Sequence, residues 1–256
     1  MTYIRSAIFA VYLVVATLAV ATFGLPAPFI SEGATRAVIK FWAKLILGGL
    51  KIICGISHRI EGEENLPVSG AIVACNHQSM WETLIFFAIL PKPVAIFKTE
   101  LLRIPVYGWW GARGGSIPVD RTAGAKSVRL LMKRTKEKYA EGAQIIVFPE
   151  GTRSPVGARP PLQPGVAGIY LATGAPCVPA GHDSGRFWRH PGQLKIPGVI
   201  TLKILPAIPP GLDRKTFLAT LRARIESARP DLASTRETDA ADATAETGNA
   251  ACATPR

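Results

Sequence analysis

The stretch AIVACNHQSMWETLIFFAI, residues 71–89, joins two apolar segments through a short polar turn. The first segment, Ala71–Cys75, has the length of a buried strand, and the second, Met80–Ile89, is long enough to form a helix. A strand followed directly by a helix is the repeating unit of α/β domains. The turn contains His77, so the unit that decides the fold also offers a candidate for chemistry.

The same alternation continues on both sides of this unit. Further apolar runs predict strands at Ile56–Ile60, Val94–Phe97, Ser116–Val119, Ala143–Phe148, Cys177–Ala180 and Val199–Leu205. Further helical patterns occur at Gly124–Tyr139, Val166–Ala172 and Lys215–Ser227. Strands separated by helices predict an α/β domain, in which ligand sites gather in the loops after the carboxyl ends of the strands.

The composition points to a membrane and to an anionic partner. Hydrophobic residues make up 48% of the 256 residues, and the mean hydropathy is +0.22. Lysine and arginine number 30 against 18 acidic residues, which gives a net charge of +12. Such a chain suits a phospholipid surface, a phosphorylated substrate or an acidic carrier protein. Nucleic acid is the weaker alternative, because the sequence has no zinc-finger spacing and no RNP-type aromatic motif.

The cysteines do not indicate a metal site or a disulfide framework. Cys54, Cys75, Cys177 and Cys252 are far apart, and no pair has metal-ligand spacing. We expect reduced thiols in a protein that faces the cytosol.

The N-terminal region has the features of a membrane anchor. No charged residue occurs between Arg5 and Glu32, and the apolar segment Ala7–Leu25 approaches the roughly 20 residues that span a bilayer. A secretory signal peptide is the alternative, because residues 19–21 resemble a cleavage site. The single arginine before the segment and the character of the chain after it favour an anchor.

The next segment, residues 35–56, predicts a basic helix that lies in the headgroup region of a membrane. Arg36, Lys40, Lys44 and Lys51 share one helical face, and apolar side chains broaden the other. A packed helix with a solvated lysine face is the alternative. Because basic residues concentrate after the apolar span, the body should be cytoplasmic, on the inner membrane. We expect membrane-anchoring helices over residues 1–54, the main domain over 55–230 and a disordered tail over 231–256.

The turn at His77 admits two interpretations. Ser79 and Glu82 have the spacing of a capping box, in which Ser79 caps the helix and Glu82 reaches back to it. That arrangement explains Glu82 but not His77. Because a turn separates His77 from Glu82, the carboxylate can also contact one imidazole nitrogen and leave the other facing a cleft. This is the base-and-orienter half of a catalytic triad.

Three later stretches carry further candidates. FKTELLRIPVYGWWGARGGSIPVDR, residues 97–121, places Lys98 and Arg121 around a loop rich in glycine and tryptophan. IIVFPEGTRS, residues 145–154, ends in a glycine turn with Arg153, whose guanidinium suits a phosphate. APCVPAGHDSG, residues 175–185, contains His182, which we expect to be a loop histidine. Taken singly, these charges also fit a solvated surface.

Four blocks occur in order: NHQSMWE (76–82), FKTELLRIPVYG (97–108), FPEGTRS (148–154) and CVPAG (177–181). Together they resemble the 1-acyl-sn-glycerol-3-phosphate acyltransferase family of the bacterial type. The third block is the most specific, and the resemblance covers roughly residues 56–205. It implies an α/β fold with a mixed, mostly parallel sheet flanked by helices, behind N-terminal membrane-associated helices.

The resemblance also implies roles for particular residues. The family's first block carries a catalytic histidine and an acidic partner, usually aspartate, which correspond to His77 and Glu82. The glutamate is one methylene longer, which puts its geometry in question. Residues implied at the acceptor substrate are Lys98, Arg121, Glu150, Gly151 and Arg153. Family members often carry a lysine just before the fourth block, where this chain reads Gln163-Pro164-Gly165, so one positive charge is absent there.

The implied reaction is acyl transfer to the sn-2 hydroxyl of 1-acyl-glycerol-3-phosphate, which gives phosphatidic acid. The acyl donor is acyl-CoA or acyl carrier protein, and no cofactor or metal is expected. Both donors are acidic, and the basic helix over residues 125–139 could receive either one or lie against anionic lipid.

Alternatives remain open from the sequence. The acceptor could be another lysolipid, such as a lyso-ornithine lipid. A lipid hydrolase or a covalent acyl-enzyme route would use a serine or cysteine, and Cys75 and Ser79 flank His77. A membrane-anchored lipid-binding protein with a decayed site is a further alternative, which the intact His77, Glu150 and Arg153 oppose.

Overall fold

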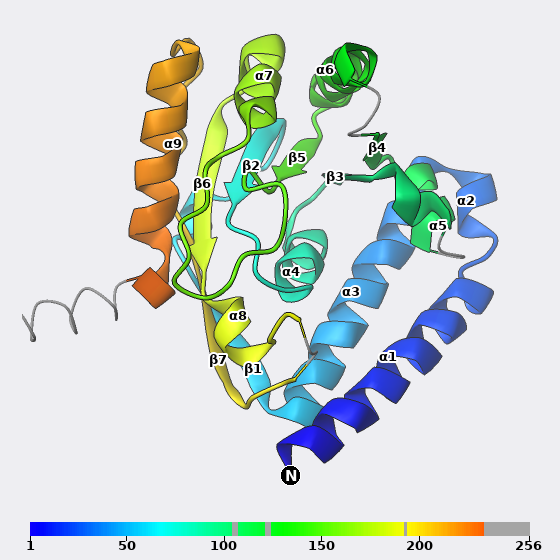
Figure 1. Ribbon diagram of the computed structural model, residues 1–256. Coiled ribbons are helices and arrows are strands. Elements are labelled where there is room, and N and C mark those ends of the chain that lie inside the picture. Colours follow the sequence, from blue (N-terminus) through cyan, green and yellow to red (C-terminus); the bar gives the residue numbers. More distant parts are fainter. Residues whose placement is uncertain (104–106, 121–123, 192–193, 233–256) are drawn as a thin grey trace, which may run out of the picture.

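The strands of the chain form one seven-stranded sheet in the order β1-β7-β6-β2-β5-β3-β4. The computed structural model describes residues 1–103, 107–120, 124–191 and 194–232 (Figure 1). Neighbouring strands run parallel except β6 and β7, which are antiparallel. The mixed, mostly parallel sheet is therefore confirmed. The strands are β1 (Ile56–Glu61), β2 (Ala71–Cys75), β3 (Pro93–Lys98), β4 (Ile117–Val119), β5 (Gln144–Val147), β6 (Cys177–His182) and β7 (Gly198–Ile204).

Helices cover both faces of this sheet. They are α1 (Thr2–Phe23), α2 (Ala27–Ile30), α3 (Glu32–Cys54), α4 (Trp81–Ile89), α5 (Tyr107–Arg113), α6 (Gly124–Ala140), α7 (Pro164–Thr173), α8 (Ser184–Phe187) and α9 (Arg214–Ala228), with short 3₁₀ turns at Glu63–Asn65 and Thr99–Arg103. Figure 1 shows α6, α7 and α9 on one side of the sheet, and α4, α3 and α1 on the other.

Each side of the sheet has its own hydrophobic core. Side chains of α1, α3 and α4 pack with Val73 and Cys75 of β2 in the first core. Side chains of α7 and α9 pack with Ile72 and Ala74 of the same strand in the second. Every residue of β2 is buried, because its alternating side chains enter both cores. The strand that precedes His77 is therefore the central and best-fixed element of the domain.

The predicted strands and helices of the main domain all form, with boundaries that shift by one or two residues. The helices α5 and α8 were not predicted. One expectation was wrong: His182 is not a loop residue but the last residue of β6, and its side chain is fully buried.

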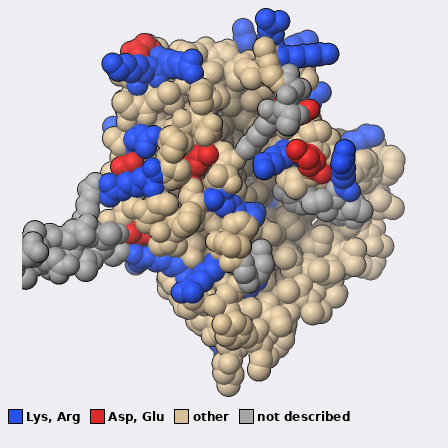
Figure 2. All heavy atoms as spheres, viewed as in Figure 1, with Lys and Arg blue, Asp and Glu red and all other residues tan. Residues whose placement is uncertain are grey.

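The helix α1 is long and apolar enough to cross a membrane, and its most apolar 18 residues have a mean hydropathy of 2.2. Its only charged residue is Arg5. It packs against α3, where Tyr12 donates a hydrogen bond to the carbonyl of Leu45 (2.8 Å) and Trp42 donates to Thr17 (3.0 Å). Its outward side chains are exposed and apolar: Ile4, Ile8, Val11, Val14, Val15 and Leu18. In Figure 2 this side of the molecule shows almost no charge.

The predicted basic face of α3 is only partly free for a membrane. Arg36 pairs with Glu32, and Lys40 donates to the carbonyl of Leu90 (3.3 Å). Lys44 and Lys51 are exposed. The helix thus combines the two alternatives, with one part of the basic face packed and the other solvated.

The ordered domain extends past residue 230, where the disordered tail was expected to begin at 231. Asp231 is 1% exposed and Leu232 is 2% exposed. A Cβ on Gly181 would lie 2.7 Å from the carbonyl carbon of Ala228, so glycine in β6 lets α9 end close to the sheet. Residues 233–256 lie outside the described residues.

Candidate active site

The end of β2 is fixed to the end of β6 before the chain reaches His77. Asn76 is fully buried, its side-chain amide donates to the carbonyl of His182 (3.0 Å), and its Oδ1 accepts from the His182 N–H (2.9 Å). The His182 Nε2 lies 3.0 Å from the Asn76 carbonyl oxygen, and its Nδ1 accepts from the Ser184 N–H (3.1 Å). The turn that carries His77 therefore starts from a rigid two-strand platform.

Glu82 contacts His77, as the turn between them permits. The Nδ1 atom of His77 lies 2.7 Å from Oε1 of Glu82, which also accepts from the N–H groups of Gln78 and Ser79, both at 2.7 Å. The other oxygen, Oε2, accepts from the hydroxyls of Ser79 (2.8 Å) and Ser184 (3.0 Å). Five donors thus converge on one carboxylate.

The capping interpretation also holds in a modified form. The helix α4 begins at Trp81, whose N–H is bonded by the hydroxyl of Ser79 (3.0 Å), while Glu82 reaches back to the N–H of Ser79. The N-cap residue is Met80, which has no side-chain cap, so Glu82 ties the turn that precedes the helix and holds His77 with the same carboxylate.

The Glu82 carboxylate is ionised at neutral pH. Burial alone would raise the pKa of Glu82, but the neighbouring His182 imidazole and the hydrogen bond with His77 lower this pKa well below its ordinary value. Burial lowers the pKa of His182, while the charge of Glu82 raises it. Hydrogen bonds from His77, the backbone and the serine hydroxyls then keep the negative charge stable.

An ionised Glu82 fixes the tautomer of His77. Nδ1 must carry the proton that Oε1 accepts, so Nε2 keeps its lone pair and can act as a base. The ring stacks on Phe148 at the end of β5, with 4.2 Å between centroids and 12° between planes. The side chain of His77 is 17% exposed. No described residue makes a hydrogen bond to Nε2, so this nitrogen is available to act as a base.

The FPEGTRS block folds over this pair. The Ser154 N–H donates to the carbonyl of His77 (2.8 Å), and the Ser154 hydroxyl donates to Glu150 (2.7 Å). The Nε atom of Arg153 donates to the carbonyl of Ser79 (3.1 Å). Gly151 takes a φ of +76°, a conformation that favours glycine, and its N–H closes the turn on Phe148 (3.0 Å). Arg153 is thereby held beside the first block.

Glu150 lies inside this loop and does not face the His77 ring. It is 5% exposed, and its Oε2 is 3.4 Å from the N–H of His77. Its Oε1 is 4.0 Å from Arg229, and burial raises its pKa. Glu150 shapes the loop that presents Arg153, so the structure places it behind the site.

The residues after α9 also support the turn that carries His77. Asp231 pairs with Arg229 (2.7 Å) and accepts from the side chain of Gln78 (2.9 Å) and the N–H of Gly157 (2.9 Å). Burial alone would raise the pKa of Asp231, but these hydrogen bonds lower it. The buried pair therefore ties the end of the domain to the residue next to His77.

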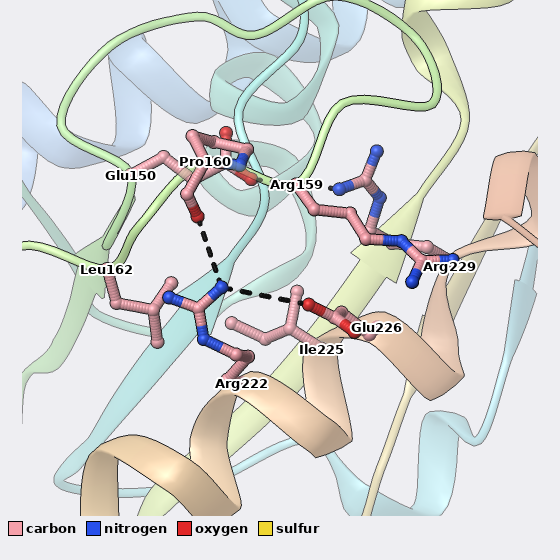
Figure 3. A pocket seen from close by; sticks show the side chains of 8 residues that line it. All are labelled: Glu150, Arg159, Pro160, Leu162, Arg222, Ile225, Glu226 and Arg229. Carbon is pink, nitrogen blue, oxygen red and sulfur yellow. Dashed lines mark hydrogen bonds and ion pairs between the residues drawn. The ribbon is translucent and has the colours of Figure 1, made fainter.

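Figure 3 shows the charged cluster behind the FPEGTRS loop. Its side chains are Glu150, Arg159, Pro160, Leu162, Arg222, Ile225, Glu226 and Arg229. Arg222 donates to the carbonyl of Pro160 (3.5 Å) and pairs with Glu226 (3.8 Å). The cavity among them has a volume of about 10 Å³, room for about one water molecule. This cluster is structural and too small for a substrate.

The other two predicted site residues are Lys98 and Arg121. Lys98 is the exposed last residue of β3, which lies two strands from β2. The structure does not bring it into contact with His77 or Glu82. Arg121 lies outside the described residues.

Sequence reasoning missed four supporting residues: Ser184, His182, Arg229 and Asp231. Ser184 and His182 follow the fourth block, so a polar cluster at the end of a predicted strand was the available signal. Arg229 and Asp231 border the tail and gave no signal of burial.

Comparisons with known proteins agree with this arrangement. The family model described as Acyltransferase matches residues 57–183. A 1-acyl-sn-glycerol-3-phosphate acyltransferase of Pseudomonas aeruginosa is 31% identical over 192 residues, which is 75% of each chain. A chloroplastic 1-acyl-sn-glycerol-3-phosphate acyltransferase of Brassica napus is 34% identical over 56% of this chain and 40% of its own length.

A solved structure shares the fold. The crystal structure of the 1-acyl-sn-glycerophosphate (LPA) acyltransferase PlsC from Thermotoga maritima aligns with a TM-score of 0.71 and 26% identity. The alignment covers 89% of this chain and 97% of that one. Fold, site and sequence similarity lead to one conclusion: the chain belongs to the 1-acyl-sn-glycerol-3-phosphate acyltransferase family.

Proposed function

We propose that this protein transfers a fatty acyl group from an acyl thioester to the sn-2 hydroxyl of 1-acyl-glycerol-3-phosphate, which yields phosphatidic acid for phospholipid synthesis. The observation that carries the proposal is the His77–Glu82 pair, whose Nε2 is open beside Arg153 in a chain of this family. The acceptor is a lysophospholipid, and the donor is acyl-CoA or acyl carrier protein. The reaction uses no resident cofactor or metal.

In this mechanism His77 is the general base. Nε2 takes the proton of the acceptor hydroxyl as its oxygen attacks the thioester carbonyl carbon. The imidazolium that forms is stabilised by Glu82, 2.7 Å away. As the carbon–sulfur bond breaks, the imidazolium returns the proton to the leaving thiolate. A positioned base of this kind contributes about 10²–10⁴-fold in rate.

Arg153, Lys98 and Arg121 are proposed to bind the acceptor phosphate. Arg153 has the clearest support, because its Nε is fixed on the Ser79 carbonyl at 3.1 Å and the next residue, Ser154, donates to the His77 carbonyl. The phosphate is attached to the carbon next to the one that bears the hydroxyl, so a cation close to His77 is the appropriate partner.

A covalent acyl-enzyme is not part of the proposal. Cys75 is fully buried, and burial raises the pKa of its thiol well above the ordinary value. The hydroxyl of Ser79 is committed to Glu82 and Trp81. Among the described residues, no serine or cysteine is bonded to the Nε2 atom that would activate a nucleophile.

We further propose that the protein sits on the cytoplasmic face of the inner membrane. The apolar outer side of α1 and the exposed Lys44 and Lys51 of α3 support contact with anionic lipid.

The test is acyl transfer from labelled acyl-CoA and acyl carrier protein to a panel of lysolipids, with the full chain in lipid vesicles. We expect transfer to 1-acyl-glycerol-3-phosphate and a loss of at least about 10²-fold in His77→Ala. His58→Ala, at an exposed position on β1, is the matched control. A preference for a lysolipid without phosphate, or normal turnover by His77→Ala, would refute the proposal.

A further inference from the structure

A second cavity lies next to the catalytic pair and has a volume of about 410 Å³. It is formed between the FPEGTRS loop and the segment that follows β6. Its lining residues are Gln78, Ser154, Pro155, Val156, Gly185, Arg186, Arg189, His190 and Pro191. Because Gln78 directly follows His77, the cavity begins beside the reacting site and extends away from it.

The lining of this cavity is basic. Arg186 is half-buried, Arg189 and His190 are exposed at the rim, and the lining has no acidic residue. Among the carboxylates around it, Asp183 accepts from the Thr201 N–H (3.0 Å) and interacts with Arg186, and Asp231 pairs with Arg229. Burial, and then the charges of Arg153 and His77, lower the pKa of His190, while the charge of Glu82 also reaches His190 and raises its pKa. The described lining of the cavity therefore carries positive charge, which suits an anion.

The order of the strands separates this cavity from Lys98, whereas Arg153 directly precedes Ser154 in the cavity wall. β6 lies on one side of the central β2, whereas β5 and β3 lie on the other. Arg186, Arg189 and His190 follow β6, and Lys98 ends β3. The cations of this segment and Lys98 therefore lie on opposite sides of β2. The proposed reaction brings together two substrates that each carry phosphate.

The two phosphates differ in their distance from the reacting atoms. The acceptor phosphate is attached to the carbon next to the one that bears the hydroxyl, so its site must lie close to His77. The donor phosphate is separated from the thioester by the long pantetheine arm, so its site must lie farther out. The cavity meets this second requirement, because its wall starts at Gln78 and its arginines lie toward the rim.

The wall that carries these cations is held in place. Trp188 is buried and meets the ring of Phe9 edge-on, with 5.5 Å between centroids. The Arg189 N–H donates to the carbonyl of Leu194 (2.9 Å), and the Gly185 N–H donates to Gln78 (3.1 Å). The backbone that carries these cations is thus held without a ligand, which lowers the ordering entropy that binding must offset.

We propose that this cavity binds the 4′-phosphate of the pantetheine arm, the anionic group that acyl-CoA and acyl carrier protein share. Arg189 and Arg186 contact the phosphate, and the arm passes Gln78 to place the thioester at His77. This inference rests on the proposed acyl transfer and adds the donor site to it.

The experiment compares two donors that differ by one phosphate: acyl-pantetheine and acyl-4′-phosphopantetheine. With the wild-type chain, we expect kcat/KM to be about 10-fold to 100-fold higher for the phosphorylated donor, as for a hydrogen-bonded charged group. Arg189→Gln should remove most of this preference and leave the acceptor KM unchanged. Arg224→Gln, an exposed arginine on α9, makes the same charge change and should keep the preference.

Other results would contradict either the donor site or the proposed function. An unchanged preference in Arg189→Gln, or a rise in the acceptor KM instead of the donor KM, would overturn the inference while transfer itself continues. The KM for acyl-CoA and for acyl carrier protein should rise together, and a rise for the carrier protein alone would overturn a pantetheine site. No transfer by the wild-type chain with any donor would overturn the proposed function itself.

Discussion

The two sides of the His77 ring are built differently. On the Nδ1 side, Glu82, Ser79 and Ser184 are at most 1% exposed and fully hydrogen-bonded. We call this the supported side. On the Nε2 side, which we call the open side, the cations are half-buried or exposed and come from loops and strand ends. His77 is thus held in one orientation by buried groups, while the proposed phosphate-binding side chains still face water. Changes on the supported side should lower kcat or stability, and changes on the open side should raise KM.

The largest expected effect is that of Glu82→Gln. An amide cannot accept on both of its ends, so some of the five donors that converge here lose their partner, and the tautomer of His77 is no longer fixed. We expect kcat to fall by about 10²–10⁴-fold, as when a triad carboxylate becomes an amide. The measurement is kcat at saturating substrates. A loss of less than about threefold would show that the supported side does not orient the base.

Glu82→Asp also tests how Glu82 orients His77, because it keeps the charge and removes one methylene. A shorter side chain cannot reach Nδ1 of His77 and the Ser184 hydroxyl together, so we expect kcat to fall by about 10-fold to 100-fold. Comparing this loss with that of Glu82→Gln separates reach from charge. Full activity in Glu82→Asp would mean that the turn adapts to either length.

The next prediction concerns stability and the buried Asp231–Arg229 pair, which ties the end of the domain to Gln78. Asp231→Ala leaves Arg229, which is 3% exposed, without its closest carboxylate. We expect a loss of about 3–5 kcal/mol in the free energy of unfolding. Glu137→Ala, in an exposed pair with Lys133 on α6, should cost less than about 1 kcal/mol. Urea unfolding of both variants measures the difference, and equal midpoints would contradict a supporting role for Asp231.

Ser184→Ala should have a smaller effect on catalysis. It removes one of the two hydroxyls on Oε2 of Glu82 but keeps the bond between Glu82 and His77. We expect kcat to fall by about 10-fold, since one hydrogen bond to a charged group is lost, and both KM values to stay unchanged. Ser227→Ala, at an exposed position on α9, is the control. A rise in KM without a fall in kcat would place Ser184 on the open side.

These residues also mark the limit of what the sequence could predict. Most strands were predictable because they are short apolar runs that are buried by one or both cores, and β2 is the clearest case. The contact between Glu82 and His77 was predictable because one local turn creates it. Ser184 joins the same carboxylate from 102 residues away, and nothing in its own surroundings indicates that partner.

The same limit explains the other differences. Arg229 and Asp231 border a segment rich in alanine, threonine and charge, so their burial could not be read from composition. It depends on the close approach of α9 to Gly181, which is a tertiary contact. The role of His182 likewise follows from the pairing of β6 with β2, which its own loop-like surroundings do not indicate.

The smallest expected effect is that of Lys98→Gln on the open side. Lys98 is exposed and two strands from β2, whereas Arg153 is fixed on the Ser79 carbonyl. An exposed charge contributes about 1 kcal/mol or less, so the acceptor KM should rise by at most about fivefold, and the rise should shrink in high salt. Arg153→Gln should raise the same KM by about 10-fold or more, because a positioned guanidinium is lost. If Lys98→Gln instead raised the KM more than Arg153→Gln, the end of β3 would have to move toward His77 when the acceptor binds. The open side would then be assembled by its substrate, in contrast to the supported side.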